Sequence, residues 1–419
     1  MEDTGRIDMP DADIATGTTR RRVLQGLGAG ALTLGAGRAL GADVRLPLPS
    51  DPRDRPMTGA FPQKGSMILQ RTRPPLLETP FEVFDQGVFT PNDRFFVRWH
   101  WAVIPESVDA AAFRLAVRGN VERPLSLSLE DVLNLPSVEL AAVNQCSGNS
   151  RGLFEPRIAG GQWDNGAMGN AKWVGVRLKD VLDRAGVKAG SVAVRFNGLD
   201  EPVVPDAPDF MKSLDLDHAR DGEVMIAYRM NGEQLPLLNG FPLRLIVPGW
   251  YSTYWVKMLS DIEVLDKPDE SFWMKTAYRI PDTPHASVRP GETGFPTVPI
   301  NRMVPRSWFT GLANGAKVKA GASAPLRGIA LGGDRGVKAV DVSTDGGATW
   351  AAAKLGADEG TYSFRRWTFD GAAAPAAGGK LEALVRCTNA DDVVQPILQP
   401  WNPGGFMRNG VETLDLTAA

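Results

Sequence analysis

The chain has 419 residues, a formal net charge of -3, 43% hydrophobic residues and 23% charged residues. This length suffices for two hydrophobic cores, and the composition is that of a globular protein, which excludes a disordered chain and a bundle of membrane helices. Because a nearly neutral chain offers no basic surface to neutralise phosphates, we expect no nucleic-acid partner.

The first 42 residues have the features of an export signal. Thr19-Arg20-Arg21-Arg22-Val23-Leu24 matches the twin-arginine pattern, and a run rich in Gly, Ala and Leu follows over residues 26–37. That run is too short and too rich in glycine to span ~30 Å of hydrocarbon. Small residues precede a predicted mature start near Asp43. Since the twin-arginine route carries folded proteins, the signal predicts a periplasmic protein and favours a bulky cofactor.

Residues 43–297 carry signals for both strands and helices. The proline-rich part, 43–75, predicts an irregular arm. The segment 95–101 predicts a strand that places Arg98 and His100 on one face. Further strands are expected at 113–118, 125–127, 192–196, 224–229 and 243–247, and helices at 129–135 and 174–185, the second ending at Gly186. This pattern predicts a mixed α+β domain.

Residues 298–419 show short apolar runs separated by Gly and Asp turns, with little helical periodicity. The clearest signal is a hairpin over 337–351, in which an alternating strand meets an aromatic strand at Asp345-Gly346. Short strands at this spacing predict an immunoglobulin-like β-sandwich as a second domain.

Potential metal ligands are few, because the chain has two cysteines and three histidines. No Cys-x-x-Cys-His motif is present, so no c-type haem is expected, and three histidines nearly exclude a site built from several of them. Cys146 lies in a polar loop, Asn144 to Gly152, after an apolar strand-like stretch. A lone cysteine is more often an inert buried residue. Small neighbours, Arg151 and the folded-export signal favour instead a thiolate that binds a metal.

Several segments, in order, resemble the sulfite oxidase family of molybdenum enzymes. They are Phe95–His100, Cys146–Arg151, Asn197–Asp200, Ala227–Gly232, Gly240–Arg244, Val247–Gly249, Trp255–Lys257 and the hairpin Val342–Trp350. The resemblance implies a molybdenum–molybdopterin cofactor in the domain 43–297, with Cys146 as the single protein ligand of the metal. The immunoglobulin-like domain, 298–419, would follow it.

The same resemblance assigns roles to individual residues. Arg98 and Arg151 would form a cationic pocket for an oxyanion, since a guanidinium pairs well with tetrahedral oxyanions, and Tyr278 would direct its hydroxyl at the substrate. The residues expected to hold the pterin and its phosphate are His100, Asp200, Arg244 and Lys257, with the backbone near Trp255 and Val256. The alternatives are structural, with Arg98 and Arg244 as ordinary strand arginines and His100 as a buried structural histidine.

The resemblance implies a periplasmic enzyme that oxidises sulfite to sulfate and passes electrons to a c-type cytochrome. No haem is expected in this chain, and the C-terminal domain is expected to support a homodimer or a heterodimer with a haem subunit. The alternatives are a sulfur dehydrogenase of a thiosulfate pathway, another molybdopterin oxidoreductase, or a cofactor-free binding protein. Asn239 stands where animal sulfite oxidases have a histidine, which leaves its contact with the cofactor open.

Overall fold

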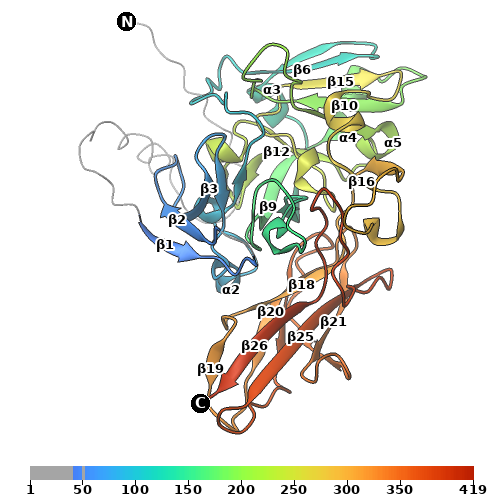
Figure 1. The fold of residues 1–419 in the computed structure, drawn as a ribbon. Helices are drawn as coiled ribbons and strands as arrows, with labels where there is room; N and C mark the ends of the chain where they lie inside the picture. Colours follow the sequence, from blue (N-terminus) through green and yellow to red (C-terminus); the bar gives the residue numbers. More distant parts are fainter. Residues whose placement is uncertain (1–40, 50–51) are drawn as a thin grey trace, which may run out of the picture.

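The computed structural model describes residues 41–49 and 52–419, and Figure 1 shows the C-terminal strands as a separate unit at one end of the molecule. The predicted export signal falls on residues 1–40, outside the described residues, and on the first two residues of strand β1. No helix in the described part of the chain is long and apolar enough to cross a membrane.

The N-terminal part of the described chain is an antiparallel sheet. Its strands, in spatial order, are β1 (Gly41–Arg45), β2 (Asp54–Thr58), β3 (Met67–Arg71), β4 (Leu76–Glu78) and β5 (Val97–Arg98). The prediction of an irregular arm over 43–75 was therefore wrong. Most prolines of this segment lie in the connections between strands, where their missing N–H groups break no ladder. Only two residues of the predicted strand 95–101 are paired, those of β5.

Two further sheets enclose the main core. The first has the order β11 (Met211–Asp215), β10 (Ala193–Asn197), β15 (Asp261–Leu265), β6 (Arg114–Gly119) and β7 (Leu125–Ser128). The second has the order β13 (Glu233–Gln234), β12 (Met225–Met230), β9 (Met168–Arg177) and β8 (Ser137–Gln145), and β14 (Arg244–Ile246) also pairs with β12. Each strand predicted between 113 and 247 overlaps one of these. Buried side chains from both sheets, such as Val117, Trp173 and Ile226, form one hydrophobic cluster.

The helices are few and short. They are α2 (Val83–Gln86), α3 (Leu129–Leu133), α4 (Leu178–Ala185), α5 (Leu216–Ala219) and α6 (Phe272–Lys275), with 3-10 turns η1 (Asn92–Arg94), η2 (Arg151–Leu153), η3 (Leu237–Asn239), η4 (Ser252–Tyr254) and η5 (Pro284–Ala286). Helix α3 begins with a capping box between Ser128 and Asp131. The predicted helix 174–185 was wrong in its first turn. Those residues belong to β9, because pairing with β8 and β12 outweighs local periodicity.

The C-terminal strands form two sheets that pack against each other. One has the order β18 (Arg306–Thr310), β20 (Leu326–Leu331), β24 (Arg365–Phe369) and β23 (Lys354–Leu355), and the other β19 (Ala316–Val318), β26 (Glu412–Ala418), β25 (Lys380–Asn389), β21 (Val337–Ser343) and β22 (Ala351–Ala352). A short ribbon, β16 (Arg279–Pro281) with β17 (Thr297–Pro299), precedes them. The predicted hairpin is confirmed by the pairing of Val342 with Ala351. Buried residues of both sheets share a second core; the immunoglobulin-like description stays a prediction.

Candidate active site

Cys146 lies directly after β8, in a tight loop fixed by its own backbone. Its N–H donates to the carbonyl of Ala167 (2.9 Å), and its carbonyl accepts the N–H of Asn149 (2.9 Å). The Asn149 side chain in turn accepts the N–H of Ala167 at 2.9 Å. Gly148 is required here, because a Cβ at this position would lie 2.5 Å from a guanidinium nitrogen of Arg151. The Cys146 side chain is thus buried at the end of a rigid strand, in a fixed direction.

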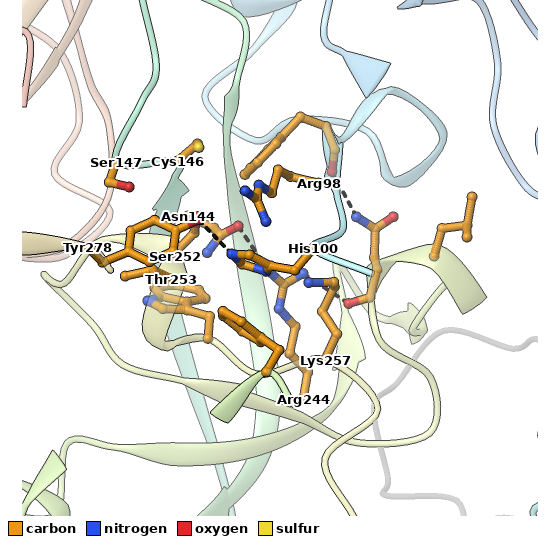
Figure 2. A pocket seen from close by; sticks show the side chains of 15 residues that line it. Arg98, His100, Asn144, Cys146, Ser147, Arg244, Ser252, Thr253, Lys257 and Tyr278 are labelled. Atoms are coloured by element: carbon orange, nitrogen blue, oxygen red, sulfur yellow. Dashed lines mark hydrogen bonds between the residues drawn. The ribbon is translucent and has the colours of Figure 1, made fainter. Parts of the chain in front are cut away.

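A cavity opens beside this cysteine, and Figure 2 shows Cys146, Arg98, His100 and Tyr278 around one common space. It is lined by Phe96, Arg98, His100, Asn144, Cys146, Ser147, Phe210, Leu238, Asn239, Arg244, Ser252, Thr253, Trp255, Lys257 and Tyr278. Seven of the ten residues predicted for the site are therefore brought together around it. The other three are Arg151, Asp200 and Val256, which do not line this cavity.

Buried cations dominate the electrostatics of the cavity. Burial lowers the pKa of Lys257 to about 7 and that of Arg244 to about 9, and the proximity of the two cations adds to the effect on Lys257. The Lys257 ammonium lies 4.2 Å from the centre of the Trp99 ring, and the Arg244 guanidinium faces the Trp173 ring at 5.3 Å. Because buried cations are costly without counter-charge, this cavity favours an anionic ligand.

His100 and Tyr278 form a polar pair at the side of the cavity. The His100 Nε2 atom lies 2.5 Å from the Tyr278 hydroxyl, and the His100 ring stacks on Phe210 with centroids 3.5 Å apart. Burial, followed by the positive charges of Arg98, Lys257 and Lys212, holds the pKa of His100 well below its usual value. Burial also raises the pKa of Tyr278. A neutral imidazole and a protonated hydroxyl therefore meet in this pair.

Side-chain atoms without protein partners identify what the cavity accommodates. Among residues 41–49 and 52–419, the buried cavity-lining atoms that lack a hydrogen-bond partner are Arg98 Nη1, His100 Nδ1, Asn144 Nδ2, Ser147 Oγ, Arg244 Nε and Thr253 Oγ1. Buried polar groups are normally paired, so this set of mostly donor groups fits a large, polar, anionic ligand. No three side chains of His, Cys, Asp or Glu gather as a metal site in the same residues.

The three predicted residues outside the lining lie close behind it. Arg151 donates from Nε to the carbonyl of Gly404 (3.1 Å), and its guanidinium lies 5.1 Å from the centre of the Phe406 ring. Asp200 is 5% exposed, and burial raises its pKa to about 6 against the opposing charge of Lys257. Val256 is 2% exposed, and its carbonyl accepts the N–H of Leu245 at 2.9 Å. These residues support the lining side chains.

Asn239 has both ends of its amide engaged by the protein. Its Oδ1 accepts from Lys64 Nζ at 2.5 Å, and its Nδ2 donates to the carbonyl of Phe96 at 3.1 Å. Its own carbonyl accepts from Arg244 Nη1 at 2.9 Å. The Asn239 side chain is thus held by Lys64 and Phe96, and its backbone carbonyl holds Arg244 at the cavity that Asn239 also lines. Lys64, in the turn between β2 and β3, was missed because no local pattern marks a lysine that binds a residue 175 positions away.

Other lining residues were also missed by reasoning from the sequence. Asn144 and Ser147 flank Cys146 and were noted only as part of its polar loop. Ser252 and Thr253 belong to η4, where two small hydroxyl residues interrupt an aromatic run of Trp250, Tyr251, Tyr254 and Trp255. That interruption was an available signal, because short polar residues inside a buried aromatic segment need partners.

Comparisons with known proteins match both parts of the chain. Residues 101–273 match the oxidoreductase molybdopterin binding domain family, and residues 299–411 match the Mo-co oxidoreductase dimerisation domain family. The chain is 35% identical over 363 residues to mitochondrial sulfite oxidase of Homo sapiens, which covers 82% of this chain and 64% of that protein. It is 32% identical over 379 residues to sulfite oxidase of Gallus gallus, covering 86% and 80%.

The fold is also similar to the crystal structure of the sulfane dehydrogenase SoxCD from Paracoccus pantotrophus. The TM-score is 0.69 at 26% sequence identity, covering 82% of this chain and 84% of that one. These matches, with the anion-favouring cavity beside Cys146, confirm the predicted molybdenum–molybdopterin cofactor. The chain belongs to the sulfite oxidase family of molybdenum enzymes.

Proposed function

We propose that this protein oxidises sulfite to sulfate at a molybdenum–molybdopterin centre whose single protein ligand is the Cys146 thiolate. The observation that carries the proposal is the convergence of a guanidinium, Arg98, and a hydroxyl, Tyr278, on the cavity that Cys146 lines. A small oxyanion beside the metal would meet a positive charge and a hydrogen-bond donor there.

The cofactor would be held by the polar atoms that lack protein partners, chiefly those of Arg244, His100 and Thr253, with the Lys257 ammonium as counter-charge. When bound, it supplies the two-electron redox change and the oxygen atom by which sulfite becomes sulfate. The chain's own contribution is to position the anion and to keep the cofactor in a buried site away from water.

The Tyr278 hydroxyl can donate one hydrogen bond, and the acceptors around it determine its direction. In the structure the hydroxyl lies within hydrogen-bond distance of His100 Nε2, and with His100 neutral this nitrogen can accept the proton. An oxyanion in the cavity would compete for the same proton. Arg98, whose charge partly opposes the burial that raises the pKa of Tyr278, would neutralise part of the anion's charge. Arg151 would add a second positive charge from behind the lining.

We further propose a periplasmic location and electron transfer to a c-type cytochrome. The twin-arginine motif at Arg20 and Arg21 supports the location, and cell fractionation with and without an Arg21→Lys exchange tests it. The match of residues 299–411 to a dimerisation domain supports association with a second copy or with a haem subunit. Retention of the protein in the cytoplasm with its signal intact would contradict the proposed location.

Sulfane oxidation is the second candidate, and the likeness to the sulfane dehydrogenase SoxCD favours it. Both substrate classes are anionic, so the cationic cavity alone does not separate them. The test is a steady-state assay of the molybdenum-loaded protein with sulfite, and separately with thiosulfate or protein-bound sulfane sulfur, using cytochrome c or ferricyanide as acceptor. We expect reduction with sulfite. Turnover with the sulfane substrate alone would replace the sulfite proposal and leave the family assignment intact.

The two cysteines provide a matched pair for testing the metal ligand. Cys146→Ser should abolish activity and strip molybdenum from the protein, because a serine hydroxyl is a poor substitute for a thiolate. Cys387→Ser changes the other buried cysteine, in strand β25 of the C-terminal domain, and should reduce stability while molybdenum remains. Equal molybdenum content in C146S and the native protein would contradict the ligand assignment.

A further inference from the structure

A segment of the C-terminal domain reaches the active site. The connection from β25 to β26, residues 390–411, leaves the sandwich, and its inner turn contacts the Cys146 loop at two points. The N–H of Met407 donates to the carbonyl of Ser147 (3.0 Å), and the carbonyl of Gly404 accepts from Arg151 Nε (3.1 Å), across 253 positions of sequence. The loop that carries the metal-ligand cysteine is thus fastened to the second domain.

Phe406 lies between Gly404 and Met407 in the sequence. It contacts Tyr278 and Arg151, the two candidate substrate residues that are not in β5. Its ring stacks on that of Tyr278, with centroids 5.6 Å apart and planes 18° from parallel. The guanidinium carbon of Arg151 lies 5.1 Å from the same ring centre. One half-buried aromatic side chain therefore contacts both the residue that carries the hydroxyl donor and the cation.

The path of Arg151 is shaped by close backbone approaches. A Cβ on Gly405 would lie 2.8 Å from Arg151 Cγ, and Gly405 has a φ of 58°. Gly148 and Gly160 border the same side chain, with hypothetical Cβ atoms 2.5 and 3.1 Å from its guanidinium nitrogens. Any residue other than glycine at position 405 or 148 would displace the Arg151 side chain. The packing is thus specific for one arginine conformation.

Arg151 keeps its charge available in this conformation. In the described part of the chain no carboxylate forms an ion pair with it; its guanidinium donates to the Gly404 carbonyl and lies against the Phe406 ring. A carboxylate would neutralise the guanidinium that it holds. An aromatic face holds a guanidinium in place and leaves its charge unpaired. This arrangement suits a cation that must attract an anionic substrate and release an anionic product in each turnover.

We propose that Phe406 is a positioning residue that orients Arg151 and Tyr278 for the anionic substrate, so that the C-terminal domain sets the affinity of the catalytic domain for its oxyanion. The inference rests on the proposed function, in which Tyr278 faces the substrate and Arg151 adds a positive charge from behind the lining. It adds a residue from the other domain that touches neither the substrate nor the metal ligand.

Kinetics of three variants of the molybdenum-loaded protein test the proposal. Phe406→Leu removes the aromatic face at similar volume, and we expect the KM for sulfite to rise about tenfold with kcat changed less than about threefold, since a lost cation–π contact weakens anion positioning. Phe406→Tyr restores the face and should restore the KM. Phe369→Leu changes another half-buried phenylalanine of the same domain and should leave the KM unchanged. If F406L does not fold, Phe406→Met takes its place with the same expectation.

Equilibrium binding separates failure of this inference from failure of the proposed function. Sulfate binding to the molybdenum-loaded protein is measured by calorimetry, and F406L should bind sulfate about tenfold more weakly than the native protein. If the native protein does not oxidise sulfite, the proposed function fails while the binding comparison still tests Phe406. Unchanged KM and unchanged sulfate affinity in F406L, or equal shifts in F406L and F369L, would overturn the inference.

Discussion

The Tyr278 hydroxyl lies 2.5 Å from Nε2 of His100, and the backbone of Tyr278 is left-handed, with a φ of 56°. A bulky residue rarely adopts this conformation, which costs of order 1–3 kcal/mol and persists only where the surroundings impose it. Here the surroundings include Phe406 on one face of the ring and Lys212 near it, with Nζ 5.6 Å from the ring centre. The hydroxyl is thus aimed by strained backbone and by packing together.

The first prediction concerns this hydroxyl. Tyr278→Phe keeps the ring and its stacking but removes the proton donor and leaves His100 Nε2 without its partner. We expect kcat/KM for sulfite to fall roughly 10²-fold, as is typical for loss of one positioned donor, while molybdenum content stays at the native level. The measurement is steady-state kinetics with metal analysis of the same samples. Native kinetics in Y278F would exclude a catalytic role for the hydroxyl.

The second prediction concerns Glu78, a carboxyl 1% exposed at the end of β4. It accepts the N–H of Gly166 (2.8 Å) and the Gln70 amide (2.6 Å). Burial, followed by the neighbouring Asp164, raises its pKa from 4.5 to about 8. Between these pH values the folded protein keeps the proton that the unfolded chain has released. The contribution of the protonated Glu78 carboxyl to the free energy of unfolding is therefore complete below pH 4.5, and it is lost as the pH rises through about 8.

Glu78→Gln should accordingly flatten the pH dependence of the unfolding free energy between pH 5 and 8. The part removed is at most about 1.4 kcal/mol per pH unit, the value for one proton. Denaturant unfolding at several pH values measures it, with exchange of the exposed Glu139 to Gln as the control. A native pH slope in E78Q would show that Glu78 is ionised in the folded protein.

The third prediction concerns cofactor retention by Arg244. This guanidinium is 4% exposed, donates to the Asn239 carbonyl and the Asn144 side chain (both 2.9 Å), and leaves Nε free toward the cavity. Arg244→Met should reduce the pterin and molybdenum content at least about tenfold, because it removes both a ligand-facing donor and charge. Fluorescence of the released pterin and metal analysis measure the loss. Arg118→Met, at an exposed ion pair with Asp261, should retain the cofactor.

The fourth prediction concerns self-association through the connection from β25 to β26. Its outer side exposes four large apolar side chains, Val393 (47%), Val394 (43%), Ile397 (53%) and Leu398 (83%). Such a patch on a dimerisation domain favours contact with a second copy. Leu398→Glu should shift the protein from dimer to monomer in light scattering after gel filtration. Val203→Glu, at an exposed valine (54%) of the catalytic part, should leave the dimer unchanged. A monomeric native protein would contradict the proposed dimer.

Much of the local structure was predictable because it depends on neighbours in sequence. The turn at Asp345-Gly346, the capping box of α3 and the stop of α4 at Gly186 all follow from backbone preferences within a few residues. The polar loop at Cys146 also stood out, since a glycine-rich turn after an apolar strand is a local pattern. Scarcity of other ligands then indicated that this thiol was the best candidate for a metal.

The sequence by itself thus determined the family, the cofactor and the identity of seven of the fifteen lining residues, through ordered motifs and the single suitable thiol. Only the tertiary structure decided that strands form within residues 43–75, that Arg151 lies outside the cavity lining, that Lys64 holds Asn239, and that Phe406 stacks on Tyr278. Those outcomes depend on contacts between residues far apart in the chain, such as Arg151 with Gly404. Local periodicity carries no information about such partners, because packing in three dimensions selects them.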